Sequence, residues 1–327
     1  MCKISMESIL PVRVNMPGNV RCVIVITYDT DMAGGYAPDG VCHGRTASFL
    51  MDYINRLCEV AEDFGIRLQF FQIANGLESD IVVSHVKNIM KRGHPVDCHT
   101  YNHVNLAYTH SKLLNEDLKM ADYLFEKRLG FKSIILRGPG GYRHLELSEE
   151  NQKVILQNGY KIVSGEFDYD LLKQKEYVYT VSSPSRNLPF RYPTGLIEVP
   201  IQGWTDRVWF DSYMLRDAGA YKEWKLKYGH KPVPEGWRCP WTDKNALEKW
   251  IQMNIDCFRY AYENRLVWVL CWHPYSHYLH DPDNQTLPSF LKVAFNKEGK
   301  VLFWTMRDLI DYMEGELSQS SKDFLNE

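Results

Sequence analysis

The chain has 327 residues, of which 45% are apolar and 24% charged, and its formal net charge is −3. This composition is ordinary for a globular protein that buries a large core. The small negative charge, with no run of lysine and arginine, argues against nucleic acid as a partner. The longest apolar runs, 23–26 and 266–272, are too short to span a membrane, and residues 1–18 lack a signal-peptide pattern.

The eight cysteines include no CxxC pair, which argues against a disulfide framework or a zinc ribbon. They stand at positions 2, 22, 42, 58, 98, 239, 257 and 271. We therefore expect reduced thiols and a cytoplasmic location.

Strands and helices alternate through the first half of the chain. Residues 1–18 are expected to form an arm or a hairpin, and the β-branched run 21–28 a strand covered on both faces. A turn-rich loop, 29–44, leads to an amphipathic helix, 45–64, that Gly65 ends. Further strands are predicted at 67–73, 94–98, 133–136 and 161–164, and helices at 79–91, 111–129 and 148–158. The alternation predicts parallel βαβ units, in an open doubly wound sheet or a closed barrel.

The alternation breaks between 172 and 243, a stretch rich in proline, tryptophan and tyrosine. We interpret it as an ordered insertion that roofs the site and shapes specificity, or else as a surface excursion packed by its own aromatic residues. The pattern then resumes with a helix at 245–264, a strand at 266–272, and a last strand and helix at 300–314.

Candidate functional residues follow the predicted strands, where sites of α/β proteins lie. Asp29 and Asp31 come after the first strand. We expect their carboxylates to point to opposite sides and to do different jobs, one binding a metal and the other taking a proton. His99 and His103 follow the strand 94–98. If this segment is a helical turn, both imidazoles lie on one face and can bind one cation together with a carboxylate.

Two further motifs follow later strands. Arg137 begins the segment Arg137–Tyr142, whose glycines and proline indicate a tight turn and whose arginine can orient a carboxylate. His273 stands between Trp272 and Pro274, at a predicted junction of strand and helix where a general acid can sit. A second pair at the same spacing, His273 and His277, is a rival metal site.

Together the four motifs resemble those of the polysaccharide deacetylases with a NodB homology domain, also called carbohydrate esterase family 4. The resemblance covers about 20–170 and 245–314. The matching segments, in family order, are Thr27–Asp31, His99–His103, Arg137–Tyr142 and Trp272–Pro274. In the commonest family form the two aspartates of the first motif are adjacent, whereas Thr30 separates them here. This spacing is similar to that of a branch with peptidoglycan deacetylase-like enzymes and metal-free allantoinases.

The resemblance implies a single domain, 1–327, built as a distorted (β/α) barrel of about seven strands, with 172–243 inserted as a lid or specificity segment. It also implies a role for each motif residue. Asp29 would be the base, held by Arg137, and His273 the acid. The metal ligands would be Asp31, His99 and His103, and the substrate contacts Pro139, Tyr142 and Trp272. Asp168, or alternatively Asp170, would pair with Arg137.

The implied activity is metal-dependent hydrolysis of a carbon–nitrogen bond, with zinc as the expected divalent ion. The first substrate class is an N-acetylated sugar or polysaccharide. A small cytoplasmic or cyclic amide is the alternative, and the paired histidines favour a metal site over the metal-free variant. A third hypothesis is a non-catalytic carbohydrate-binding relative, whose nine tryptophans would stack on sugars. No membrane partner is expected, and the insertion could instead make a homo-oligomer contact.

Overall fold

The computed structural model describes residues 9–31, 44, 46–167, 188–214, 239, 244–297 and 299–313. Within these residues one ten-stranded sheet forms, in which β2 (Cys22–Asp29) is the first long strand. All eight residues of β2 are buried, so the prediction of a strand covered on both faces is confirmed. β2 pairs in parallel with β3 (Gln69–Gln72), β9 (Val267–Trp272) and β10 (Val301–Trp304).

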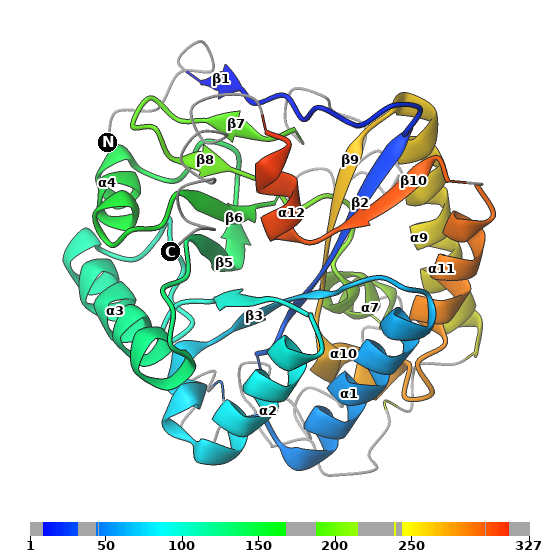
Figure 1. Ribbon diagram of the computed structural model, residues 1–327, viewed down its shortest axis with the longest axis horizontal. Helices are drawn as coiled ribbons and strands as arrows, with labels where there is room; N and C mark the ends of the chain where they lie inside the picture. Colours follow the sequence, from blue (N-terminus) through cyan, green and yellow to red (C-terminus); the bar gives the residue numbers. More distant parts are fainter. Residues whose placement is uncertain are drawn as a thin grey trace.

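Eight parallel strands make up a distorted (β/α) barrel, where about seven were expected (Figure 1). Beyond β3 the strand order continues through β4 (Val96–Cys98), β5 (Ile135–Tyr142), β6 (Ile162–Glu166) and β8 (Ile197–Glu198). Gln202 bridges the gap between β8 and β9: its backbone N–H donates to the Val269 carbonyl at 2.9 Å. The Gln202 side-chain oxygen accepts from the Val269 N–H at 2.8 Å, so the ring is completed by one residue.

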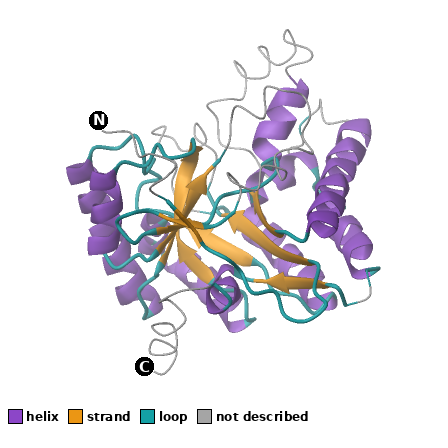
Figure 2. Cartoon of the chain, turned by 90° about the horizontal axis from the view of Figure 1, so that it is seen from above, coloured by secondary structure: helices purple, strands orange, loops and turns teal. Residues whose placement is uncertain are grey.

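The helices lie around the outside of the strands, and Figure 2 shows them on either side of the sheet. In chain order they are α1 (Ser48–Asp63), η2 (Ala74–Glu78), α2 (Asp80–Lys91), α3 (Ser111–Leu124) with its π turn η3 (Phe125–Leu129), α4 (Glu149–Gln157), α7 (Asp206–Met214), α9 (Lys244–Asn264), α10 (Pro274–His280), α11 (Thr286–Phe295) and α12 (Met306–Asp311). α11 was not predicted, because Pro288 indicates a helix boundary. In the structure Pro288 lies in the first turn of α11, where a backbone N–H would have no helical partner and its loss costs nothing. No described helix has the length and apolar character needed to cross a bilayer.

Strand alternation divides the apolar side chains of β2 between two cores. Val23 and Val25 face the barrel interior, where residues of α12 also pack. Ile24 and Ile26 face the helices. The same alternation places Asp29 on the inner face, two residues beyond Thr27, at the carboxyl end of the strand. The functional end of the barrel is therefore opposite α12.

Residues 9–18, the described part of the N-terminal segment, do not pair with one another. Instead β1 (Leu10–Pro11) pairs antiparallel with β7 (Phe190–Arg191), which pairs antiparallel with β8. Both β7 and β8 come from the stretch predicted as an insertion, so this part of it belongs to the sheet. Residues 168–187 and 215–238 lie outside the described residues, and the lid function stays a prediction.

A close approach of backbone between β5 and β6 makes Gly165 a critical position. A Cβ at Gly165 would lie 2.5 Å from Tyr142 Cε1 and 3.0 Å from Gly138 Cα. Tyr142 cannot yield easily, because its buried hydroxyl donates to Glu198 at 2.5 Å. We predict that Gly165→Ala lowers the free energy of unfolding by about 1–3 kcal/mol, measured by urea denaturation.

Ser164→Ala is the matched control, because the buried Ser164 hydroxyl has no hydrogen-bond partner within the described structure. Its removal should leave the unfolding midpoint nearly unchanged. Equal midpoints for Gly165→Ala and Ser164→Ala would show that β5 and β6 have room to separate.

Candidate active site

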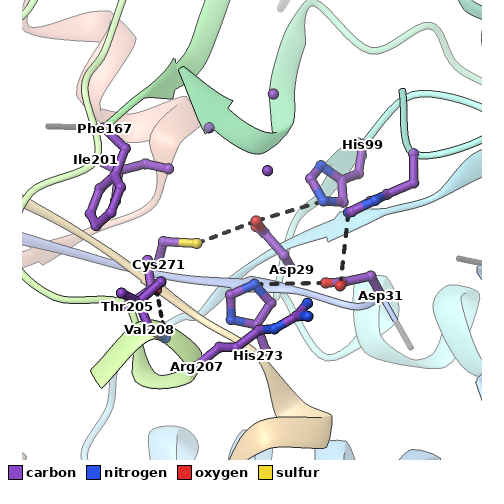
Figure 3. A pocket seen from close by; sticks show the side chains of 14 residues that line it. Asp29, Asp31, His99, Phe167, Ile201, Thr205, Arg207, Val208, Cys271 and His273 are labelled. Carbon is purple, nitrogen blue, oxygen red and sulfur yellow. Dashed lines mark hydrogen bonds and ion pairs between the residues drawn. The ribbon is translucent and has the colours of Figure 1, made fainter. Parts of the chain in front are cut away.

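A cavity of about 310 Å³ opens at the carboxyl ends of the barrel strands (Figure 3). Asp29 ends β2, His99 follows β4, and His273 follows β9. The full lining consists of Asp29, Asp31, His99, His103, Gly138, Gly140, Gly141, Phe167, Ile201, Thr205, Arg207, Val208, Cys271 and His273. The structure thus brings all four predicted motifs to one place. Since Asp29 and Asp31 are two residues apart in extended chain, they face the same cavity, and the expectation of opposite sides was wrong.

The two histidines of the second motif are carried by a loop and not by a helical turn. Thr100 and His103 have positive φ angles of 61° and 56°, in the left-handed region that a right-handed helical turn does not use. Asp117 of α3 accepts hydrogen bonds from the two backbone N–H groups after Thr100, at 2.7 and 2.9 Å. The His99 and His103 ring centroids come within 4.9 Å, so the imidazoles still meet although the helical expectation was wrong.

Asp31, His99 and His103 form a candidate metal-binding set. Their ligand atoms all lie within 4.8 Å of one another. The His99 Nδ1 contacts the Arg137 carbonyl at 3.0 Å, which assigns the ring proton to Nδ1 and leaves the Nε2 lone pair for a metal. The buried Asp31 Oδ1 has no hydrogen-bond partner among the described residues. These donors fit a divalent ion with open coordination positions.

The protonation states of the three groups suit the same role. Burial lowers the pKa of His99, and burial lowers that of His103 to about 4, so both imidazoles are neutral near pH 7. Burial alone would raise the pKa of Asp31, but the neighbouring imidazoles, His273 foremost, outweigh it and the pKa falls. One anionic oxygen and two neutral nitrogens are what zinc prefers.

Arg137 holds the second carboxylate, Asp29. The fully buried guanidinium stands with Nε 3.3 Å from Asp29 Oδ1. It also lies over the Phe71 ring, 4.5 Å from the centroid, and its Nη2 donates to the Thr27 hydroxyl at 2.6 Å. Arg137 is therefore itself fixed in place beside Asp29, whose side chain lines the cavity.

Two residues predicted as alternatives for pairing with Arg137 cannot be placed. Asp168 and Asp170 lie outside the described residues. Among the described residues the carboxylate beside Arg137 is Asp29.

His273 is oriented by Asp206, a residue that sequence reasoning missed. The Asp206 Oδ1 lies 2.7 Å from His273 Nδ1, and its Oδ2 accepts the His273 backbone N–H at 2.9 Å. Burial would lower the pKa of His273, but Asp206 and then Asp31 outweigh it and raise the pKa to about 9. Asp206 opens α7, within the stretch interpreted as an insertion. The only local signal was a helix start, Thr205-Asp206, which many surface helices share.

The rival pair does not form a second metal site in the described structure. His277 is fully buried and packs against Trp272 and Tyr28, with ring centroids 5.1 and 5.8 Å away. Its Nε2 lies 3.6 Å from Asp206, and it does not line the cavity. The aromatic surroundings give it a place in the core.

The three predicted substrate contacts do not line the cavity. Trp272 faces the helices, because Cys271 and His273 on either side of it take the inward positions of β9. Tyr142 is fully buried with its hydroxyl bonded to Glu198, and Pro139 is buried with its carbonyl accepting from Asn105 at 2.9 Å. The apolar and polar walls are instead formed by Phe167, Ile201, Thr205, Arg207 and Val208.

The fold and site define a (β/α) barrel with a candidate Asp–His–His metal centre at its carboxyl end. Residues 21–163 match the family model described as polysaccharide deacetylase. The match supports, over this part of the chain, the resemblance that the motifs indicated. This match supports a hydrolase of the deacetylase type.

Three solved structures show the same fold. A Mycobacterium smegmatis protein named as a polysaccharide deacetylase is 14% identical with a TM-score of 0.60, covering 97% of this chain and 94% of its own. One from Pseudomonas aeruginosa PAO1, named likewise, is 15% identical with a TM-score of 0.59, covering 90% and 91%. The Puue allantoinase is 14% identical with a TM-score of 0.57, covering 90% of both chains. No curated protein sequence matches the chain.

Asp206→Asn tests the origin of the raised pKa of His273. The substitution removes a negative charge 2.7 Å from the ring, so the imidazole should lose its proton at lower pH. In the metal-free protein, an NMR titration of His273 should give a pKa at least about one unit below that of the parent. Asp256→Asn, on the exposed side of α9, is the control and should leave the titration unchanged. Identical curves for parent and Asp206→Asn would mean that another group charges His273.

Asp117→Ala tests whether the loop of His99 and His103 is held from α3. Losing two hydrogen bonds to its backbone should let the imidazoles drift and weaken zinc binding about tenfold or more, measured by calorimetry. The neighbouring Glu116 is exposed, and Glu116→Ala should bind zinc as the parent does. If Asp117→Ala binds zinc with unchanged affinity, the loop is held by other contacts.

Proposed function

We propose that this protein is a metal-dependent hydrolase of amide bonds that removes the acetyl group of an N-acetylated sugar or polysaccharide. One arrangement carries the proposal: Asp29 and His273 both adjoin the set Asp31, His99 and His103, in a single cavity. Asp29 Oδ2 is 3.7 Å from His99 Nε2, and His273 Nε2 is 3.8 Å from Asp31 Oδ1. A base and an acid thus adjoin one candidate metal centre.

A divalent ion bound there would polarise the acyl carbonyl and lower the pKa of a water molecule. Asp29 takes the proton of the attacking water, and Arg137 keeps its Oδ1 in place so that Oδ2 faces the reaction. Burial of Asp29 and Arg137 keeps bulk water from competing for these contacts.

His273 then completes the reaction as the acid. Its raised pKa keeps the imidazole protonated near neutral pH, and Asp206 holds Nδ1 so that Nε2 points into the cavity. The amide C–N bond breaks as His273 gives its Nε2 proton to the leaving nitrogen. The products are a free amine and a carboxylic acid. Asp29 then releases its proton to solvent, and His273 takes up a proton from solvent, so both return to their starting states.

A small amide is the second candidate substrate, and the size of the cavity favours it. About 310 Å³ is at the lower end of the range for small-molecule sites, so the described walls fit one sugar ring or a compact amide. A cytoplasmic location, as predicted from the thiols, would also supply small substrates more readily than a cell-wall polymer.

Chelation and substrate screening test the proposal together. Removing metal should lower hydrolysis of N-acetylated sugars or of cyclic amides at least about 100-fold, and zinc should restore it. Asp29→Asn should lose a similar factor while keeping its zinc content, measured by elemental analysis. Asp256→Asn is again the control for the effect of losing a surface charge.

Each other outcome points to a different conclusion. Activity that survives chelation in a protein without bound metal removes the ion from the mechanism. Binding of sugars without hydrolysis of either substrate class favours a non-catalytic relative. Hydrolysis of cyclic amides alone selects the second candidate.

A further inference from the structure

A second cluster of metal-binding side chains lies beside the first. The ligand atoms of Asp29, Cys271 and His273 are all within 4.8 Å of one another. Figure 3 shows the Cys271 thiol and the Asp29 carboxylate pointing toward each other across the cavity, with His273 alongside. The Cys271 Sγ is 3.3 Å from Asp29 Oδ2, close to the spacing of about 3.5 Å between sulfur and oxygen on a tetrahedral zinc ion.

Each of the three side chains presents its ligand atom to this point. The Nδ1 of His273 contacts the Asp206 carboxylate, as one ring nitrogen of most metal-binding histidines contacts a carboxylate or carbonyl. The other ring nitrogen, Nε2, is therefore the one that can bind a cation. Asp29 uses Oδ1 toward Arg137 and has Oδ2 turned toward the thiol. The carboxylate can therefore bind a cation through Oδ2 without giving up Arg137.

The two clusters adjoin each other. Asp29 Oδ2 is 3.7 Å from His99 Nε2 and Asp31 Oδ1 is 3.8 Å from His273 Nε2, so the carboxylates stand between the two positions. Proteins hold paired metal ions about 3.5–4 Å apart when anionic groups lie between them. A thiolate at Cys271 would add a third negative charge to those of Asp29 and Asp31.

We propose that Asp29, Cys271 and His273 form a second, inhibitory site for a thiophilic divalent cation such as Cd²⁺ or excess Zn²⁺. Binding replaces the thiol-to-carboxylate hydrogen bond by bonds from the cation to sulfur, oxygen and nitrogen. The thiol proton of Cys271 and the Nε2 proton of His273 leave to solvent. Soft thiolate ligands select zinc and cadmium over Mg²⁺.

The inhibitory part of this inference rests on the proposed function. There Asp29 takes a proton and His273 gives one, and a cation that binds both removes the base and the acid together. Binding itself needs only the three side chains, so it can be measured whether or not the protein is a hydrolase.

The test titrates metal-free protein with Cd²⁺, measuring bound metal by native mass spectrometry and the ultraviolet charge-transfer absorption of the cadmium–thiolate bond. The parent should bind two ions per chain and show the absorption. Cys271→Ser should lose the absorption and bind the second ion at least about 100-fold more weakly. Cys257→Ser removes a buried thiol of α9 and should behave as the parent.

His99→Ala separates the two sites. It should lose the first ion and keep the cadmium–thiolate absorption. The hydrolysis rate of the parent should fall about tenfold or more in excess Zn²⁺ or Cd²⁺ but not in Mg²⁺. The hydrolysis rate of Cys271→Ser should be the same with and without the excess Zn²⁺ or Cd²⁺.

An absorption that persists in Cys271→Ser, or a parent that binds one ion only, would overturn the second site. Loss of the absorption in Cys271→Ser without hydrolysis of any substrate by the parent would leave the site standing and reject the proposed function. Equal inhibition of parent and Cys271→Ser would reject the inhibitory role.

Discussion

The parallel pairing of β2 with β3 and β9 is the constraint on which the rest of the site depends. Tyr28 lies level with Phe70 and Trp272, so the carboxyl ends of the three strands finish together. Asp29 is then the last residue of β2, and His273 follows β9 directly. A shift of one residue would turn Asp29 toward the helices and leave Arg137 without its carboxylate.

Two buried carboxylates, on two different helices, hold the histidines of the site in position. Asp117 on α3 holds the loop of His99 and His103, and Asp206 at the start of α7 holds His273. Neither lines the cavity, so neither would touch a substrate. The site is thus built from strand ends that supply reactive groups and helices that aim them, which is the division of labour expected in (β/α) barrels.

Cys271 adds a soft sulfur ligand to a site that otherwise contains carboxylates and histidines. Its thiol is buried beside Asp29, and burial raises the pKa of the thiol well above its usual range, so it normally donates to the carboxylate. A cation that displaces this proton would bind the proposed base, Asp29, and the proposed acid, His273, at the same time. The same inward face of β9 therefore carries both the proposed acid and the proposed means of blocking it.

Local patterns in the sequence determined most of the strands and helices and the motif residues of this protein, but not β1, β7 and β8. The β-branched run of β2 and the helical spacing of α1 act within a few residues, and so does the grouping of His99 with His103. Tertiary structure alone decided which distant groups meet. Asp29 and Cys271 are 242 positions apart and Asp206 and His273 are 67 apart, so no local pattern connects them. Barrel closure joins these pairs because it fixes the register of every strand at once.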